Sequence, residues 1–180
     1  MDDFFIDDIS EHYQKKPKVN GKAKGNRAEL ALCKLLTKHF GEEFSRSLGS
    51  GGRWSQVGNM PEHAKKTLTG DVCIPQKFFY TIESKNGYED EINLTNACDG
   101  AIPRLDEFIK QVVRDADYSG RKPIICWKRN HKPWLAIIKK IDFANEIDYY
   151  VNYREWRIVN LEELLRITDR KFWFADDASN

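Results

Sequence analysis

Three charged residues near the middle of the chain could together do chemistry on a phosphate ester. Glu83 and Lys85 end the largely hydrophobic run Phe78–Lys85, and Asp71 precedes that run. Because side chains alternate along a strand, Glu83 and Lys85 would share one face of it. If the chain turns at Pro75-Gln76-Lys77, Asp71 lies nearly opposite Glu83, where cross-strand Cβ atoms are about 5 Å apart. We therefore expect two carboxylates to converge, with a lysine beside them.

Two carboxylates that close together repel each other unless a positive charge compensates them. Mg²⁺ suits such a place, because it takes a few carboxylate oxygens together with water and phosphate oxygens. We expect Asp71, Glu83 and the main-chain carbonyl of Ser84 to hold one or two Mg²⁺ ions, with Mn²⁺ as a substitute. Such ions activate water and stabilise in-line displacement at a phosphodiester. Lys85 would orient the attacking water or stabilise charge in the transition state.

A helix upstream of this pattern carries a further acid. Apolar residues recur at helical spacing from Arg27 to about Phe40, after a basic, glycine-containing lead-in, Gly21–Gly25. Glu29 begins one of these apolar rows and would therefore point toward the interior, where it could join the site. The alternative is a capping box, with Asn26 as the N-cap and Glu29 as the third helical residue.

The remaining pattern predicts an α/β fold with a central mixed β-sheet flanked by helices. A Ser/Gly-rich segment, 45–70, is long enough to be a functional loop, or else a plain surface loop. We expect an N-terminal arm at 1–20, a core domain at 21–140 and a C-terminal extension packed on that core at 141–180. The expected elements are strands 71–74 and 78–85, a polar loop 86–101, helix 103–116, a hairpin of strands 123–128 and 134–139, strand 157–159, and helix 161–167 with Asn160 as its N-cap.

Composition excludes several classes of protein. Hydrophobic residues make up 41% and charged residues 32%, which is typical of a folded, water-soluble domain. No apolar run approaches the roughly 18 residues of a membrane helix, and the acidic start does not resemble a signal peptide. The expected location is therefore the cytoplasm, or the host cytoplasm for a phage protein. The four cysteines and four histidines are scattered, so we expect neither a disulfide framework nor a zinc site.

The net charge of +1 hides an uneven distribution. Between Tyr13 and Lys66 there are twelve lysine and arginine residues against four acids. Such a basic segment could face phosphate groups, or it could be an ordinary solvated face.

Four motifs occur in an order that resembles archaeal Holliday junction resolvases and related phage nucleases of the PD-(D/E)XK superfamily. They are Lys24–Leu30, Arg46–Gly51, Gly70–Val72 and Ile82–Lys85, and the later helix and the strand beginning at Pro133 also fit. The resemblance covers roughly residues 22–140. It implies a restriction-endonuclease-like core and Mg²⁺-dependent cleavage of phosphodiester bonds.

The resemblance also implies roles for individual residues. Asp71, Glu83 and Lys85 match the catalytic core, and Glu29 matches a helix-borne acid that holds a metal-bound water. The implied contacts with the DNA backbone are Lys22, Lys24, Arg27, Arg46, Ser47, Ser50 and Arg53. The chain departs from the pattern at Gly70, which replaces the proline of the superfamily's name, and in two longer segments, 54–69 and 141–180.

The favoured interpretation is a structure-selective DNA endonuclease that cuts branched DNA as a homodimer, because two cuts need two sites related by two-fold symmetry. The tail aromatics Trp156 and Phe172-Trp173-Phe174 could supply a dimer surface or belong to the core. One alternative is a sequence-specific or nicking endonuclease on the same core. Another is a nuclease fold that only binds nucleic acid, although close carboxylates would repel phosphate. A structural protein with fortuitous residues is the remaining alternative.

Overall fold

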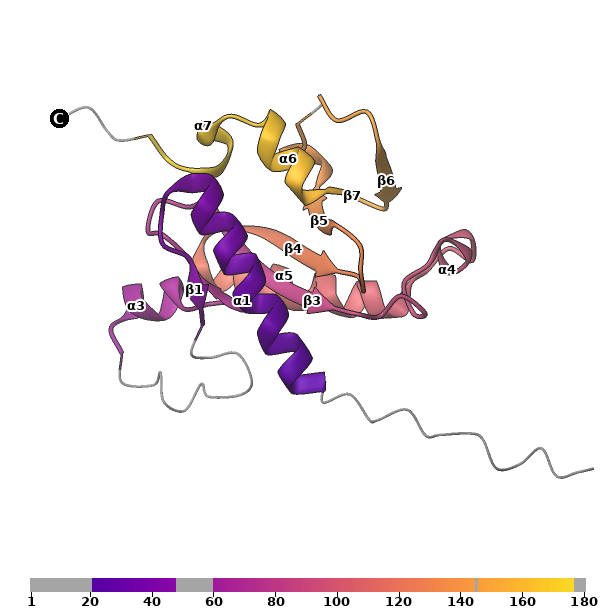
Figure 1. Ribbon diagram of the computed structural model, residues 1–180, viewed down its shortest axis with the longest axis horizontal. Coiled ribbons are helices and arrows are strands. Elements are labelled where there is room, and N and C mark those ends of the chain that lie inside the picture. Colours follow the sequence, from indigo (N-terminus) through magenta and orange to yellow (C-terminus); the bar gives the residue numbers. More distant parts are fainter. Residues whose placement is uncertain (1–20, 48–59, 145, 177–180) are drawn as a thin grey trace, which may run out of the picture.

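The computed structural model describes residues 21–47, 60–144 and 146–176; the expected arm at 1–20 lies outside this range. Its centre is a five-stranded sheet in the order β3-β4-β5-β7-β6 (Figure 1). β3 and β4 are parallel, and the other neighbours are antiparallel, so the predicted mixed sheet is confirmed. The strands are β3 (Tyr80–Asn86), β4 (Lys122–Lys128), β5 (Trp134–Lys139), β6 (Tyr150–Tyr153) and β7 (Trp156–Asn160).

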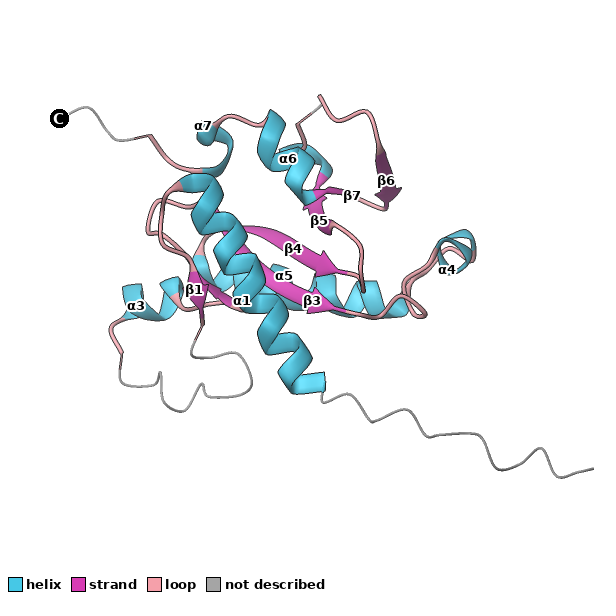
Figure 2. Cartoon of the chain, in the orientation of Figure 1, coloured by secondary structure: helices cyan, strands magenta, loops and turns pink. Residues whose placement is uncertain are grey.

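Helices cover both faces of this sheet, as predicted. α1 (Gly21–Phe40) lies in front of the sheet and α5 (Pro103–Ser119) behind it (Figure 2). Strand alternation divides the core accordingly: Ile124 of β4 packs in the cluster that contains Leu32 of α1, and Ile125 packs in the cluster that contains Leu105 of α5. Shorter helical segments are α3 (Glu62–Thr67), α4 (Leu94–Cys98), η2 (Lys140–Asp142), α6 (Leu161–Ile167) and α7 (Arg170–Trp173).

The predicted hairpin is wrong, because strands 71–74 and 78–85 do not pair with each other as a β-hairpin. β2 (Val72–Cys73) instead pairs antiparallel with β1 (Ser45–Arg46) in a separate small sheet. The start of β3 is engaged by the C-terminal segment, since the Phe79 amide donates to the Trp173 carbonyl at 2.8 Å. Pro75 also has no amide to offer a neighbouring strand. Asp71, just before β2, does keep a backbone hydrogen bond to β3.

α1 begins at Gly21, earlier than predicted, so the supposed lead-in Gly21–Gly25 is helical. Glycine costs about 1 kcal/mol in a helix, and packing has to offset this cost. One such contact is the hydrogen bond at 3.2 Å from the Asn86 side chain to the Lys24 carbonyl. Asn26 is therefore inside the helix rather than its N-cap, which removes the capping box as the explanation of Glu29.

The segment after residue 140 completes the sheet rather than only covering it. It supplies β6 and β7, and the structure adds β6 and α7 to the predicted elements. Trp173 and Phe174 belong to the same buried cluster as Leu32 of α1, and Trp156 is buried in the cluster on the α5 face. These three aromatic side chains are thus core residues and not a dimer surface.

Two local expectations are confirmed. The Asn160 side chain accepts the Glu163 amide at 3.0 Å and caps α6, and β4 and β5 form the predicted hairpin. Across the described residues, we find no helix that is both long and apolar enough to span a membrane.

Candidate active site

Asp71 is fastened to the outer edge of β3 by two hydrogen bonds. Its amide donates to the Ile82 carbonyl at 3.0 Å, and its Oδ2 accepts the Ser84 amide at 2.9 Å. Glu83 lies between these two contact points along β3. The structure therefore brings the two carboxylates together, although not through the hairpin that the sequence suggested.

The main-chain carbonyl of Ser84 faces the same edge. The Ile82 carbonyl and the Ser84 amide both point toward Asp71. Because the amide and the carbonyl of one strand residue point to the same side, the Ser84 carbonyl also points away from β4. The three expected metal donors thus lie together at one edge of β3, where Asp71 is hydrogen-bonded to the strand.

Lys85 is positioned by α5 as well as by its own strand. Its Nζ donates to Glu83 Oε1 and, at 3.2 Å, to Gln111 Oε1. The ammonium also lies 4.8 Å from the centre of the Phe108 ring. Sequence reasoning missed Gln111 and Phe108; the available signal was a polar Gln111 placed between the inward-facing Phe108 and Val112.

Glu83 is almost completely buried, with 1% of its surface exposed. Burial raises the pKa of Glu83 most, the neighbouring Asp71 charge raises it further, and Lys85 lowers it, which leaves a pKa of about 8. The carboxylate pair therefore has more negative charge than Lys85 alone can compensate when both groups ionise.

The donors fit a magnesium ion better than a metal that needs a full protein cage. Within the described ranges, no three or more His, Cys, Asp or Glu side chains are grouped to hold a metal. Mg²⁺ is commonly bound by one or two carboxylates while it keeps several waters. The Ser84 hydroxyl is buried and has no hydrogen-bond partner in the described part of the chain, so a polar group beside Asp71 is still unsatisfied.

Glu29 lies with Arg46 rather than in a three-carboxylate cluster. Arg46 Nε donates to Glu29 Oε2 at 2.6 Å, and the Arg46 Nη2 donates to Asn26 Oδ1 at 2.9 Å. Arg46 is paired with Val72 in the small sheet, one residue after Asp71. Glu29 and Arg46 are therefore neighbours of the strand that delivers Asp71, approached from the α1 face.

The other predicted DNA contacts differ in accessibility. Lys22 and Arg27 are exposed on α1, and Lys24 is half-buried. Ser47 is only 3% exposed, and its hydroxyl donates to the Leu68 carbonyl at 2.7 Å. Its amide donates to the Asp71 carbonyl at 3.0 Å, so Ser47 helps to hold Asp71 in place. Ser50 and Arg53 lie outside the described residues.

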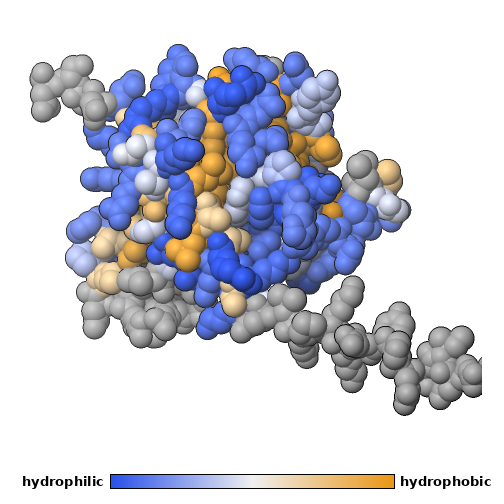
Figure 3. Space-filling view, in the orientation of Figure 1, coloured by the Kyte–Doolittle hydropathy of each residue, from blue (hydrophilic) through white to orange (hydrophobic). Residues whose placement is uncertain are grey.

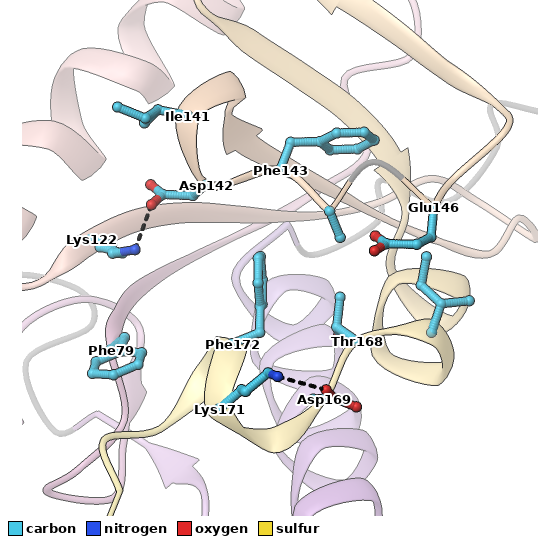
Figure 4. A pocket seen from close by; sticks show the side chains of 12 residues that line it. Phe79, Lys122, Ile141, Asp142, Phe143, Glu146, Thr168, Asp169, Lys171 and Phe172 are labelled. Atoms are coloured by element: carbon cyan, nitrogen blue, oxygen red, sulfur yellow. Dashed lines mark hydrogen bonds and ion pairs between the residues drawn. The ribbon is translucent and has the colours of Figure 1, made fainter.

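A cavity of about 570 Å³ lies at the opposite end of β3, beside Phe79, which precedes β3, and Lys122, which begins β4 (Figure 4). Two ion pairs cross its lining, Lys122–Asp142 at 2.5 Å and Lys171–Asp169 at 3.3 Å. None of the predicted catalytic or metal-binding residues lines this cavity. The candidate active site is therefore the carboxylate pair at the edge of β3 and not this hollow.

Gly70 has a geometric reason to replace the superfamily's proline. Its φ of +89° lies in the left-handed region, whereas proline fixes φ near −65°. A Cβ at this position would stand 2.7 Å from the Ile82 carbonyl oxygen. Only glycine therefore lets Asp71 reach β3 along this path.

We predict that Gly70→Ala destabilises the protein more than Gly100→Ala, by at least about 1 kcal/mol. Both glycines have positive φ, but a Cβ at Gly100 meets nothing within 4 Å, so the matched variant isolates the clash with β3. Urea denaturation of both variants measures the difference. Equal losses of unfolding free energy would show that the close approach of Gly70 to Ile82 has no energetic weight.

The raised pKa of Glu83 predicts a pH-dependent stability of the metal-free protein. An unfolded glutamate loses its proton near pH 4.3, roughly, whereas folded Glu83 keeps it to about pH 8. The unfolded chain therefore binds fewer protons in this window, and stability falls as the pH rises through it. In EDTA, we expect the wild type to lose stability relative to Glu83→Gln between about pH 5 and pH 8, by on the order of 1 kcal/mol or more. A pH-independent difference between the two proteins would contradict the assignment.

Comparisons with known proteins identify a family that the chain matches. Residues 20–173 match the model of a family described as "Phage putative PDDEXK endonuclease". The chain is 25% identical over 128 residues to Protein D14 of Escherichia phage T5, which covers 69% of this chain and 74% of that protein. Among solved structures, the Holliday junction resolvase Hjc of Archaeoglobus fulgidus is 16% identical and covers 76% of this chain and 86% of its own, with a TM-score of 0.39.

The family match spans nearly the whole chain and includes Glu29, Asp71, Glu83 and Lys85. It also includes β6, β7 and α6, for which the sequence motifs alone offered no counterpart. This chain belongs to the family of phage PD-(D/E)XK endonucleases.

Proposed function

We propose that this chain is a Mg²⁺-dependent endonuclease that hydrolyses phosphodiester bonds in DNA. The observation that carries the proposal is the pair formed by Asp71 and the buried Glu83 at the edge of β3. Among the described residues, the positively charged group that bonds this pair is Lys85. A divalent ion held by this pair and the Ser84 carbonyl would supply an activated water and neutralise charge on the reacting phosphate. Mn²⁺ would substitute for Mg²⁺, and the site would hold one or two ions.

Residues of the chain would position the metal ligands and stabilise charge on the phosphate. The Oδ2 atom of Asp71 accepts a hydrogen bond from the backbone amide of Ser84. The carboxylate is therefore oriented by the main chain of β3 and not by another flexible side chain. Lys85 is aimed by Gln111 and Phe108, and it would place a positive charge where negative charge develops on the phosphate. Such preorganisation is what makes a fixed ammonium effective in a water-poor site.

Glu29 and Arg46 would act from the α1 face. Their ion pair at 2.6 Å holds both side chains beside β2, the strand that follows Asp71. Glu29 would orient a water molecule, and Arg46 would contact the phosphate backbone with donors of its guanidinium, which is planar and suited to phosphate. Lys22, Lys24 and Arg27, on the first turns of α1, would extend this contact.

We propose branched DNA as the substrate class and a homodimer as the active form. The proposal rests on the resemblance of the motifs around Glu29, Arg46, Asp71 and Glu83 to those of junction resolvases. Cutting both strands of a junction symmetrically needs two copies of the site. A sequence-specific or nicking endonuclease would use the same carboxylates on linear duplex.

The proposal predicts that Asp71→Ala and Glu83→Ala each reduce Mg²⁺-dependent cleavage at least about 100-fold. The assay compares a four-way junction, a linear duplex and a single strand of the same sequence, with and without EDTA. Glu162→Ala serves as the control because this exposed acid on α6 lies outside the site. Cleavage retained by both active-site variants would refute the mechanism.

The same cleavage assay tests which class of DNA is the substrate. Preferential cutting of the junction supports branched DNA, whereas equal cutting of junction and duplex contradicts structure selectivity. Junction binding without cutting in either metal would favour the alternative of a nuclease fold that only binds nucleic acid.

A further inference from the structure

We propose that the turn between β4 and β5, together with Lys24 of α1, forms a second phosphate-binding site that holds the DNA backbone beside the carboxylate pair. This inference rests on the proposed function, because it names a DNA contact that guides the strand toward the same site. Its central residue is Arg129, and its ligand is a phosphodiester group.

The turn continues directly from the candidate active site. In the parallel ladder, Lys85 is level with Trp127 and Asn86 is level with Lys128. The connection is rigid, since the Gly87 amide donates to the Lys128 carbonyl at 2.9 Å and the Trp127 indole donates to the Gly87 carbonyl at 2.6 Å. With strand spacings of 4.8 and 3.3 Å, Arg129 begins roughly 8 Å from Lys85. A DNA backbone bound at Lys85 would therefore meet this turn next.

Basic side chains from two separate parts of the chain, α1 and the turn after β4, lie on either side of Glu89. Lys24 Nζ and Glu89 Oε2 stand 3.5 and 3.9 Å from the point where a Cβ of Gly87 would be. The Asn130 amide lowers the pKa of Glu89 most, and the charges of Lys24 and Arg129 contribute to the same shift. Lys24 and Arg129 therefore flank the same acid. Glu89 itself accepts the Asn130 amide and braces the turn, so it is already committed to a structural role.

Two lysines add positive charge to the turn between β4 and β5. Lys128 Nζ donates to the Lys132 carbonyl at 2.6 Å and lies 5.5 Å from the centre of the Trp134 ring. Lys132 is exposed. Lys24 and Arg129 thus flank Glu89, and Lys128 and Lys132 add two positive charges to the same turn, an excess that favours an anion. The surface over the ends of β3 and β4, to the right of α1, is strongly hydrophilic (Figure 3).

The environment of Arg129 differs from that of a basic side chain on an ordinary solvated surface. Its Nε is buried and has no hydrogen-bond partner in the described part of the chain. Its guanidinium is held over the Trp127 ring at 5.9 Å. The Nε of Arg157 is also unpartnered, but that guanidinium lies 4.1 and 4.4 Å from two ring centres, Phe143 and Tyr150. A buried donor without a partner is costly, and a phosphate oxygen would satisfy it with the planar fork that arginine presents.

The test measures binding without cleavage. Fluorescence anisotropy in EDTA follows a labelled duplex and a labelled four-way junction over a range of salt concentrations. We expect Arg129→Ala to weaken binding about 10-fold and to reduce the slope of log affinity against log salt by about one. Arg129→Lys should keep the slope and lose part of the affinity. Lys132→Ala should reduce the slope in the same way and leave the core untouched.

Arg166→Ala is the matched control, because it removes an exposed arginine from α6, away from this turn. Thermal unfolding of each variant confirms that it is folded. If Arg129→Ala and Lys132→Ala both bind DNA as tightly, and with the same salt slope, as Arg166→Ala, the second site is refuted. That result would leave the cleavage mechanism standing, whereas full cleavage by Asp71→Ala would refute the mechanism and not the binding site.

Discussion

The attachment of Asp71 to the edge of β3 is the contact on which the rest of the site depends. Neither of its two hydrogen bonds, to the Ile82 carbonyl and from the Ser84 amide, belongs to a regular ladder. They hold a carboxylate from one small sheet against a carboxylate of the central sheet. The close approach is opened by Gly70 and braced by Ser47, whose amide bonds the Asp71 carbonyl. Negative charge is thereby concentrated where burial already disfavours it, which is the condition under which a cation binds strongly.

The edge strand β3 contributes side chains to both faces of the sheet. Its Tyr80 and Ile82 fix it in the core beneath α1, while Glu83 and Lys85 point to the face covered by α5. Its parallel neighbour β4 leads directly into the turn that contains Arg129. The groups proposed to catalyse cleavage and to contact DNA are therefore placed by one pair of strands, and a phosphate backbone bound to this pair would be contacted at successive positions.

Sequence reasoning recovered what periodicity dictates. Alternation placed Glu83 and Lys85 on one face, and helical spacing identified α5 and most of α1. It brought Asp71 to Glu83 by a hairpin that does not exist, because it could not know that the Trp173 segment takes the edge of β3 near Phe79. That contact joins parts of the chain too far apart in sequence for any local pattern to report. The same limit hid Gln111, which matters only because α5 crosses Lys85, and the buried Nε of Arg129. The prediction of Asn26 as an N-cap failed for another reason. Asparagine is a favoured N-cap residue, but α1 begins before it, at Gly21, where contacts with β3 and Arg46 stabilise the additional turn.

The most direct test of the central claim is equilibrium binding of Mn²⁺, followed by its electron paramagnetic resonance signal in the absence of DNA. The account predicts that the wild type binds the ion and that Asp71→Asn and Glu83→Gln each lose that binding. Glu29→Gln should retain most of it, because Glu29 is engaged with Arg46 and forms no cluster with the pair. Wild-type affinity in both Asp71→Asn and Glu83→Gln would contradict the account, since the metal would then be held somewhere other than the edge of β3.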